Sequence, residues 1–146
     1  MNPHPSLEKI HSAIPHRAPM LLVDEIVLQD QESIVCKKTF HPDEYFFHGH
    51  YPGHPLTPGV ILCESAVQSG AVLLSEIVDA VGGVPVLTRM GDVKFKRMVH
   101  PGDTIENYVK LDEVVSTAYY MTAKIKCKGK MVARLSFTCT LAPADS

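Results

Sequence analysis

The residues best suited to chemistry lie in one stretch, where histidines in a loop precede a predicted helix and an acid follows inside it. The histidines are His48, His50 and His54, and glycine and proline residues stiffen the loop around them. The acid is Glu64, on the second turn of the predicted helix. A neutral imidazole is well matched to removing a proton near pH 7. A carboxyl group in partly apolar surroundings can hold a proton and donate it, so the stretch predicts a base and an acid.

The start of the predicted helix supplies a third chemical group. Thr57 is predicted as its N-cap and Pro58 as its first residue, where a missing N–H costs nothing. A helix N-terminus presents unpaired N–H groups and a partial positive charge, which suit an oxygen gaining negative charge. Gly59 is the first such donor, and its missing side chain lets a substrate come close. A base, an oxyanion donor and an acid are the parts needed to remove a proton alpha to a carbonyl and to expel a beta substituent.

The same residues also have purely structural interpretations. A histidine in a surface loop is usually only a surface residue, and a helical wheel places Glu64 in one polar sector with Gln68 and Asp79, as on a solvated face. Gln68 can orient the Glu64 carboxyl group by a hydrogen bond or point into water. A metal site on the three histidines is disfavoured because no further ligand follows at a familiar spacing. Spacing alone leaves the enzymatic and structural interpretations open.

Periodicity predicts the elements that must position these residues. One long helix is predicted from Pro58 to about Ala80, ending at Gly82-Gly83, and a short helix over Ser6–Ile14. Residues 41–56 are expected to be irregular. Strands are predicted over Met20–Val27, Ser33–Phe40, Val84–Arg89, Val93–Val99, Thr104–Val114, Thr117–Cys127 and Met131–Leu141. The stripe predicted to face the sheet consists of Leu62, Ala66, Gly70, Leu73 and Ile77. One helix against an antiparallel sheet predicts a two-layer α+β domain of the hot-dog type over residues 1–146.

Composition and charge exclude several classes of function. The chain has 146 residues, 45% of them apolar, which fits a single globular domain. Fourteen Lys and Arg against sixteen Asp and Glu give a net charge of −2, which argues against a nucleic-acid surface or polybasic membrane anchoring. No secretory signal or membrane span is expected from the pattern. The cysteines lack paired close spacing, which favours free thiols in a reduced cytoplasm over a zinc or disulfide site; they are Cys36, Cys63, Cys127 and Cys139.

The site residues occur in blocks that resemble the (3R)-3-hydroxyacyl-acyl-carrier-protein dehydratases of type II fatty acid synthesis. The family signature GHFPGxPxxPGVLxxEAxAQ is similar to GHYPGHPLTPGVILCESAVQ over residues 49–68. The pattern LPHRxPFLLVD resembles IPHRAPMLLVD over residues 14–24. A third pattern, RFKRPVxPGD, resembles KFKRMVHPGD over residues 94–103. The blocks stand in the family's order, so the resemblance covers most of the chain.

The resemblance implies an enzyme that removes water from a 3-hydroxyacyl thioester to give a trans-2-enoyl thioester. His50 matches the family's catalytic histidine and Glu64 its catalytic acid, and the two come from opposite subunits of a homodimer, often within a trimer of dimers. The positions implied to contact the substrate are Tyr51, Gly59, Val60 and Gln68, with the Gly59 N–H binding the thioester carbonyl. The partner implied is acyl carrier protein, whose phosphopantetheine arm brings the acyl chain to an apolar tunnel. No metal or redox cofactor is implied.

Three points stay open on the sequence alone. Glutamate at position 64 favours simple dehydration, because the related dehydratase and isomerase branch carries aspartate there. The basic residues Lys94, Lys96 and Arg97 form either a solvated strand edge or a docking site for an acidic carrier protein. Other functions are compatible with the pattern: a hot-dog acyl thioesterase in which Glu64 directs water, or a member of a specialised polyketide, aryl-polyene or polyunsaturated-lipid pathway.

Overall fold

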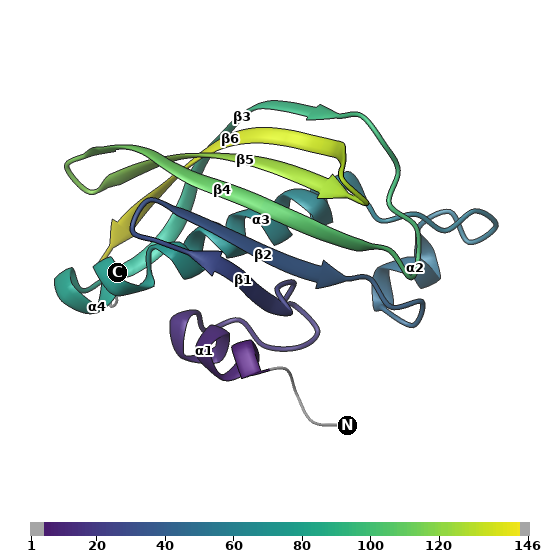
Figure 1. Ribbon diagram of the computed structural model, residues 1–146, viewed down its shortest axis with the longest axis horizontal. Coiled ribbons are helices and arrows are strands. Elements are labelled where there is room, and N and C mark those ends of the chain that lie inside the picture. The colour runs from purple at the N-terminus through teal and green to yellow at the C-terminus, as the bar shows by residue number, and fades with distance from the viewer. Residues whose placement is uncertain (1–4, 144–146) are drawn as a thin grey trace.

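A bent antiparallel sheet curves around one long helix in the computed structural model, which describes residues 5–143 (Figure 1). The six strands follow the order β1-β2-β4-β5-β6-β3, and every neighbouring pair is antiparallel. The strands are β1 (Glu25–Gln29), β2 (Ser33–Thr39), β3 (Val84–Phe95), β4 (Thr104–Val115), β5 (Ala118–Cys127) and β6 (Lys130–Ala142). The helices are α1 (Pro5–Ala13), α2 (Tyr45–Gly49), α3 (Gly59–Leu73) and α4 (Ser75–Val81). The architecture confirms the predicted α+β class; residues 1–4 and 144–146 of the predicted domain lie outside the described part.

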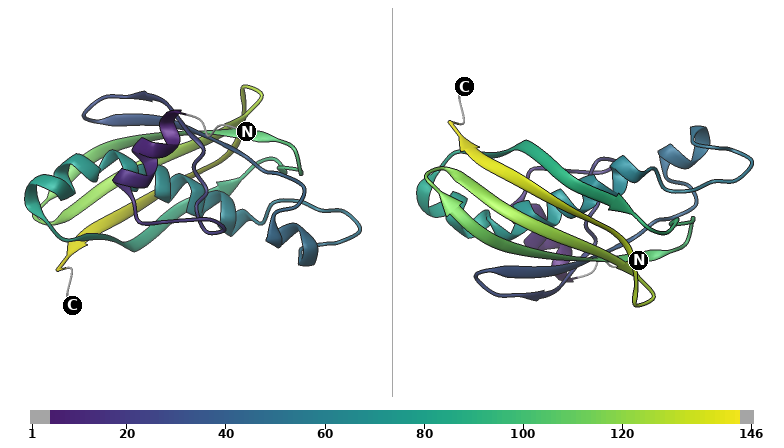
Figure 2. Two further views of the ribbon diagram at one scale, coloured as in Figure 1. Left: turned by 90° about the horizontal axis from the view of Figure 1, so that it is seen from below. Right: turned by 90° about the horizontal axis from the view of Figure 1, so that it is seen from above.

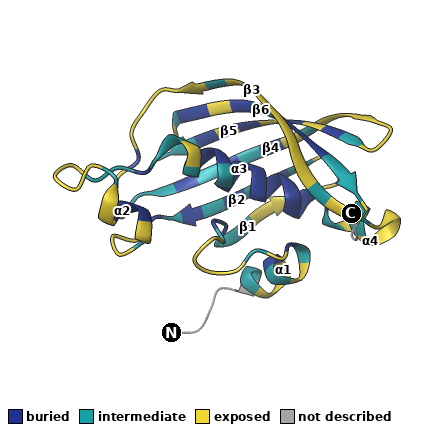
Figure 3. Cartoon of the chain, turned by 180° about the vertical axis from the view of Figure 1, so that it is seen from behind, coloured by how far each residue is buried: buried dark blue, intermediate teal, exposed yellow. Residues whose placement is uncertain are grey.

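The α3 helix is the centre of the core because small and apolar residues surround most of its circumference. Figure 2 shows α3 lying along one face of the sheet, with α1 on the same side beside β1. Figure 3 shows that α3 is buried along most of its length. The predicted sheet-facing stripe is confirmed from Leu62 to Leu73, whereas Ile77 lies on α4 and is half-buried. The core therefore has two layers, with one helix filling the concave side of the sheet.

Gly70 marks a close approach between the middle of α3 and the sheet. A β-carbon at this position would lie 2.8 Å from Cζ of Phe137 and 3.1 Å from Sδ of Met121. We expect Gly70→Ala to destabilise the fold by about 1–3 kcal/mol, because an added methyl group overpacks this contact. Chemical denaturation measures the change in the free energy of unfolding. Gly53→Ala is the matched control, because a β-carbon there has no neighbour within 4 Å; equal stabilities of the two variants would contradict the prediction.

The predicted long helix is interrupted at Leu74, whose φ of −79° and ψ of −5° stay in the right-handed region but differ from regular α-helical values. The axes of α3 and α4 differ by 50° in direction as a result. The predicted end at Gly82 is confirmed, with a left-handed φ of +88° that glycine adopts without steric cost. The predicted N-cap is wrong: Pro58 occupies that position, and the hydroxyl oxygen of Thr57 is buried without a hydrogen-bond partner among the described residues.

Three further elements differ from the predicted ones. The first strand begins at Glu25 rather than Met20, because the backbone before it bonds to other groups: Leu22 N–H donates to the side chain of Gln68. The strand predicted over Val84–Arg89 and the first residues of the one predicted over Val93–Val99 form one strand, β3. It ends at Phe95, so residues 96–99 are not part of a strand, and its register shifts twice along β6. β-bulges of this kind insert extra residues without ending a strand. The stretch predicted to be irregular contains the short helix α2.

Two further predictions concern membrane spans and the state of the cysteines. No single helix in this range is both long and apolar enough to cross a membrane; α3 and α4 pass that test only as a bent pair. All four cysteines are free.

Candidate active site

The loop that carries His50 is anchored by the aromatic residues of α2. Phe46 and Phe47 are buried, and their rings meet edge to face with centroids 4.9 Å apart. His50 follows directly, and its N–H donates to the carbonyl oxygen of Phe46. Its ring Nδ1 lies 3.0 Å from the carbonyl oxygen of Leu56. Because a carbonyl can only accept, Nδ1 carries the proton and Nε2 presents a lone pair, as a general base requires.

Tyr51 adopts an unusual backbone conformation next to this histidine. Its φ of +53° lies in the left-handed region, which costs a residue with a side chain about 1–2 kcal/mol. The Tyr51 ring is 64% exposed and meets the imidazole of His50 edge to face at 4.7 Å. Strained residues of this kind cluster at functional sites, where the surrounding structure holds them in place. Tyr51 thus turns the backbone directly after His50. It also lines a shallow apolar hollow together with Leu56 and Met98.

The start of α3 opens onto a second hollow of about 560 Å³. The N–H groups of Ile61 and Leu62 both donate to the carbonyl oxygen of Pro58. Within residues 5–143, the N–H groups of Gly59 and Val60 have no acceptor, so they are free to bind an oxygen atom. The residues that line this hollow are Leu56, Thr57, Gly59, Val60, Leu62, Phe95, Lys96, Arg97 and Met98.

Glycine is needed at position 59 because of a neighbour on the sheet. A β-carbon there would lie 2.8–3.2 Å from ring carbons of Phe95. The missing side chain therefore lets Phe95 close over the helix start while the N–H of Gly59 stays accessible from the hollow. Gly59, the predicted oxyanion donor, accordingly borders the hollow, and Val60 beside it is 72% exposed.

Glu64 is held through one of its carboxylate oxygens. Gln68 Nε2 donates to Glu64 Oε2 at 2.8 Å and to the carbonyl oxygen of Met20 at 2.8 Å. The Gln68 Oε1 atom accepts from Leu22 N–H at 2.7 Å, and the residue is 1% exposed. The structure thus decides between the two interpretations of Gln68: it orients Glu64. Both amide hydrogens of Gln68 have protein acceptors, which leaves none for the substrate contact predicted from the sequence.

The bond from Gln68 also determines where Glu64 can hold a proton. Oε2 accepts a hydrogen bond, so the proton of a neutral Glu64 belongs on Oε1. The Glu64 side chain is 28% exposed, which is less than a fully solvated helix face would give. The carboxyl group therefore stands at a boundary between protein and solvent with one oxygen held and one available.

The thiols near the site are poor nucleophiles. Burial raises the pKa of the Cys63 thiol, beside Glu64 in the sequence. Burial, with a smaller contribution from the charge of Glu64, raises the pKa of Cys139 to about 11. Both thiols stay protonated at neutral pH and are unsuited to covalent catalysis. Among the described residues, no three His, Cys, Asp or Glu side chains gather as metal ligands would.

His16, for which the sequence patterns predict no role, lies beside the acid. His16 Nε2 is 4.0 Å from Glu64 Oε2. The signal that could have found it is the IPHR stretch of the N-terminal block, because it places a histidine next to a charged residue that can organise a loop. Arg17 does so by donating to the carbonyl oxygens of His11, Ile14 and His16.

The two predicted catalytic residues are not in contact within one chain. No hydrogen bond or ion pair within residues 5–143 joins His50 to Glu64. The predicted docking residues also separate: Lys96 and Arg97 line the hollow at the start of α3, whereas Lys94 lies opposite Arg134 on the outer face of the sheet. The predicted site residues therefore occupy two separate places within one chain, one around His50 and one around Glu64.

Comparison with known proteins identifies the family. A FabA-like domain matches residues 14–136. A 3-hydroxyacyl-acyl-carrier-protein dehydratase FabZ from Fusobacterium nucleatum is 40% identical over 136 residues, which is 92% of this chain and 95% of that protein. A FabZ from Oenococcus oeni is 41% identical over 107 residues, which is 73% of this chain and 77% of that protein. The chain belongs to this dehydratase family. Members of this family are hydro-lyases.

Solved structures agree with the fold of this dehydratase family member. The dehydratase heterocomplex ApeI:P from Xenorhabdus doucetiae has a TM-score of 0.80 at 17% identity, over 93% of this chain and 92% of that one. The PaaI protein of the E. coli phenylacetic acid degradation operon has a TM-score of 0.64 at 18% identity, over 80% of this chain and 81% of that one. At these identities the likeness concerns the fold alone, and it confirms the predicted hot-dog arrangement.

Proposed function

We propose that the protein removes water from (3R)-3-hydroxyacyl chains on acyl carrier protein, yielding trans-2-enoyl thioesters for fatty acid biosynthesis. One observation carries this function: a member of the dehydratase family holds an imidazole with a free Nε2 and a carboxyl group with a free Oε1. We place the enzyme in the cytoplasm, where its free cysteines stay reduced.

The proposed mechanism assigns one step to each group. Nε2 of His50 takes the proton from C2 of the acyl chain, and the N–H of Gly59 stabilises the enolate-like oxygen of the thioester. The electron pair left at C2 forms the double bond to C3 as the C3–O bond breaks. Oε1 of Glu64 gives its proton to the departing hydroxyl, which leaves as water. When the enoyl thioester and water have formed, the C2 proton is on His50 and Glu64 is ionised, and the proposed reaction uses no metal or redox cofactor.

A complete site then needs a second copy of the chain. β3 is an edge strand, paired only with β6 in the described part, and it exposes Val86, Leu87 and Met90 by 41–44%. An apolar, unpaired edge is a template for pairing with another chain. The loop that follows α2 also projects past the end of the sheet (Figure 1). We propose a homodimer, assembled further as a trimer of dimers, in which His50 of one subunit meets Glu64 of its partner.

One experiment tests the proposed function directly. Carrier proteins loaded with 3-hydroxyacyl chains of different lengths are incubated with the protein, and their intact masses are measured. We expect the loss of one water per chain, with the preferred carrier and chain length indicating a general or a specialised pathway. Release of free thiol without loss of water would instead make the protein a thioesterase.

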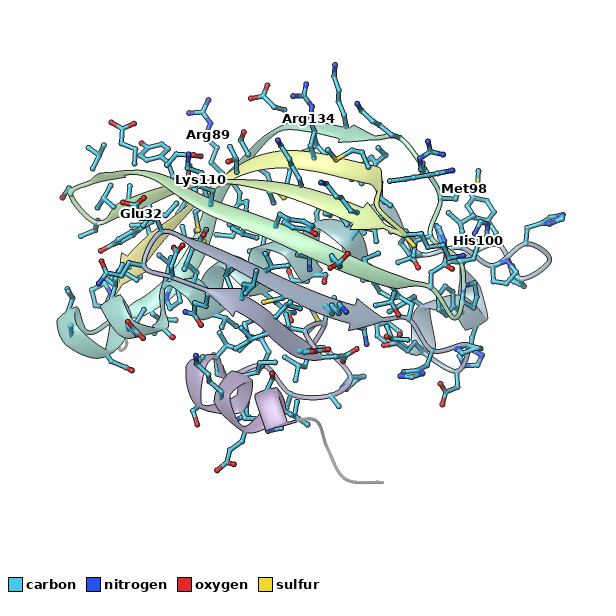
Figure 4. The ribbon with its side chains drawn as sticks, viewed as in Figure 1. Glu32, Arg89, Met98, His100, Lys110 and Arg134 are labelled. Atoms are coloured by element: carbon cyan, nitrogen blue, oxygen red, sulfur yellow. The ribbon has the colours of Figure 1, made fainter. Side chains whose placement is uncertain are left out.

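A row of exposed cations crosses the outer face of the sheet and extends the predicted docking residues. This cation row consists of Lys94 on β3, Arg134 on β6 and Lys124 on β5, which lie directly opposite one another in the strand register. Like charges in such pairs repel, yet none of the three has a carboxylate within ion-pair distance among the described residues. Figure 4 shows Arg134 on the outer side of the sheet, away from α3.

The neighbouring row of the sheet shows that such repulsion is avoidable. There Lys37, Glu106 and Lys126 alternate in sign across β2, β4 and β5. The cation row has no acidic residue between its cations. It ends on β3, the strand whose Phe95 lines the hollow at the start of α3. We propose that it docks the acidic carrier protein, because complementary charge steers association.

Charge reversal in the cation row tests the docking surface. We expect Arg134→Glu to lower kcat/KM for a carrier-linked substrate about 10-fold at low salt, because the carrier loses a favourable charge and meets a repulsive one. Turnover of a short thioester analogue should stay unchanged, and high salt should narrow the gap by screening. Lys9→Glu, an equal charge change at an exposed position of α1, is the matched control. Equal losses of kcat/KM with both substrates would show that the cation row does not dock the carrier protein.

A further inference from the structure

The imidazole of His16 lies close to the carboxyl group of Glu64 but makes no hydrogen bond to it. The distance from its Nε2 to Glu64 Oε2 is 4.0 Å, which is the limit of an ion pair and too long for a hydrogen bond. The His16 side chain is 30% exposed and the Glu64 side chain 28% exposed, so water screens the contact only in part. The interaction between the two side chains is therefore electrostatic and is not a hydrogen bond.

The loop around His16 is organised in a way that brings the imidazole to this place. The guanidinium of Arg17 donates to the carbonyl oxygens of Ile14 at 2.9 Å, His16 at 2.7 Å and His11 at 2.9 Å. One cation thus ties the end of α1 to the backbone of His16. Farther along, the clamp by Gln68 on Met20 and Leu22 fixes the same segment against α3. The segment that carries His16 is consequently held at both ends. Gln68 holds Glu64 as well, so both side chains have fixed positions.

The other nitrogen of His16 indicates how the ring is protonated. Nδ1 is buried and has no hydrogen-bond partner among residues 5–143. Buried N–H groups without an acceptor are rarer in proteins than buried acceptors without a donor. The proton of a neutral His16 therefore belongs on Nε2, which places the positive end of an N–H dipole on the ring atom that lies 4.0 Å from Glu64 Oε2. Gln68 Nε2 presents a second N–H to the same oxygen at 2.8 Å.

We propose that His16 is a positioning residue for the acid of the reaction. Its Nε2–H and the amide of Gln68 both face Oε2, and they stabilise the negative charge that forms on Glu64 when Oε1 gives its proton to the departing hydroxyl. His16 does not touch the substrate in this arrangement and exchanges no proton with it. The inference rests on the proposed dehydration, and it adds the N-terminal block to the machinery of the site.

A set of variants separates this role from a purely structural one. We expect His16→Ala to lower kcat about 10-fold to 100-fold, which is part of the contribution of a general acid, with KM and the melting temperature little changed. His16→Gln should retain most activity, because its amide nitrogen stands as many bonds from the backbone as Nε2 of histidine. His11→Ala is the matched control: this half-buried histidine of α1 has no side-chain contact with Glu64 within the described chain.

A double-mutant cycle provides the decisive measurement. If His16 acts through Glu64, His16→Ala should cause no further loss of kcat in a Glu64→Gln background, because effects that share one path are not additive. Additive losses, equal losses in His16→Ala and His16→Gln, or full activity in His16→Ala would each overturn the inference. The NMR resonance of the Glu64 carboxyl carbon, which should shift in His16→Ala and not in His11→Ala, tests the contact without turnover. An inactive wild-type protein with that shift would overturn the dehydratase assignment and leave the contact supported.

Discussion

Replacing His50 with alanine is expected to lower kcat for dehydration about 1,000-fold, within the range that a general base contributes. The reason is the hydrogen bond from its Nδ1 to the carbonyl oxygen of Leu56, which leaves Nε2 as the ring atom that can accept a proton. The melting temperature should change little, because the imidazole is half-buried and donates one hydrogen bond. Intact-mass measurement of the loaded carrier protein follows the loss of water over time.

His48→Ala is the control for this prediction, because the residue lies two positions away and is exposed. Its ring Nε2 lies 3.3 Å from the carbonyl oxygen of Asp43, which precedes α2, whereas His50 follows that helix. We expect this variant to keep wild-type turnover. Comparable losses in both variants would mean that the loop, rather than the His50 imidazole, limits activity.

The fold class was predictable because hydrophobic periodicity is a local signal that survives in the folded chain. The apolar stripe from Leu62 to Leu73 faces the sheet as expected, and alternation along β4, β5 and β6 places their inner residues in the core. The hydrogen bond between Gln68 and Glu64 was also within reach, since residues four apart on a helix are neighbours. Local spacing thus predicted both the layers and one side of the candidate site.

The features that the sequence did not predict depend on contacts between distant segments. The start of β1 is delayed because Leu22 bonds to Gln68, which lies 46 residues further along the chain. Ser65 similarly donates to the carbonyl oxygen of Leu22. The proximity of His16 to Glu64 has the same origin, because no local pattern relates a loop after α1 to the second turn of α3. Secondary-structure propensity describes one element at a time, so it does not predict contacts between residues that are distant in the sequence.

Replacing Glu64 with glutamine should also remove most turnover, by about 100-fold to 10,000-fold, because the amide has no acidic proton to give to the departing hydroxyl. Glutamine has nearly the same size and keeps an oxygen that can accept from Gln68 Nε2, so the clamp at 2.8 Å should persist. We therefore expect an unchanged melting temperature with a large loss of kcat. A stable variant that retains turnover would show that Glu64 does not supply the proton.

Mixing the two inactive variants tests whether the half-sites around His50 and Glu64 are completed by a second chain. In a dimer with shared sites, a chain carrying His50→Ala still has Glu64, and a chain carrying Glu64→Gln still has His50. One of the two sites in each mixed dimer is then intact, so random exchange of subunits at equal amounts restores about a quarter of wild-type activity. If each chain instead formed its own site, every site in the mixture would lack one group, and activity would stay at the level of the separate variants. The gain on mixing therefore measures the sharing itself, independently of how much each residue contributes.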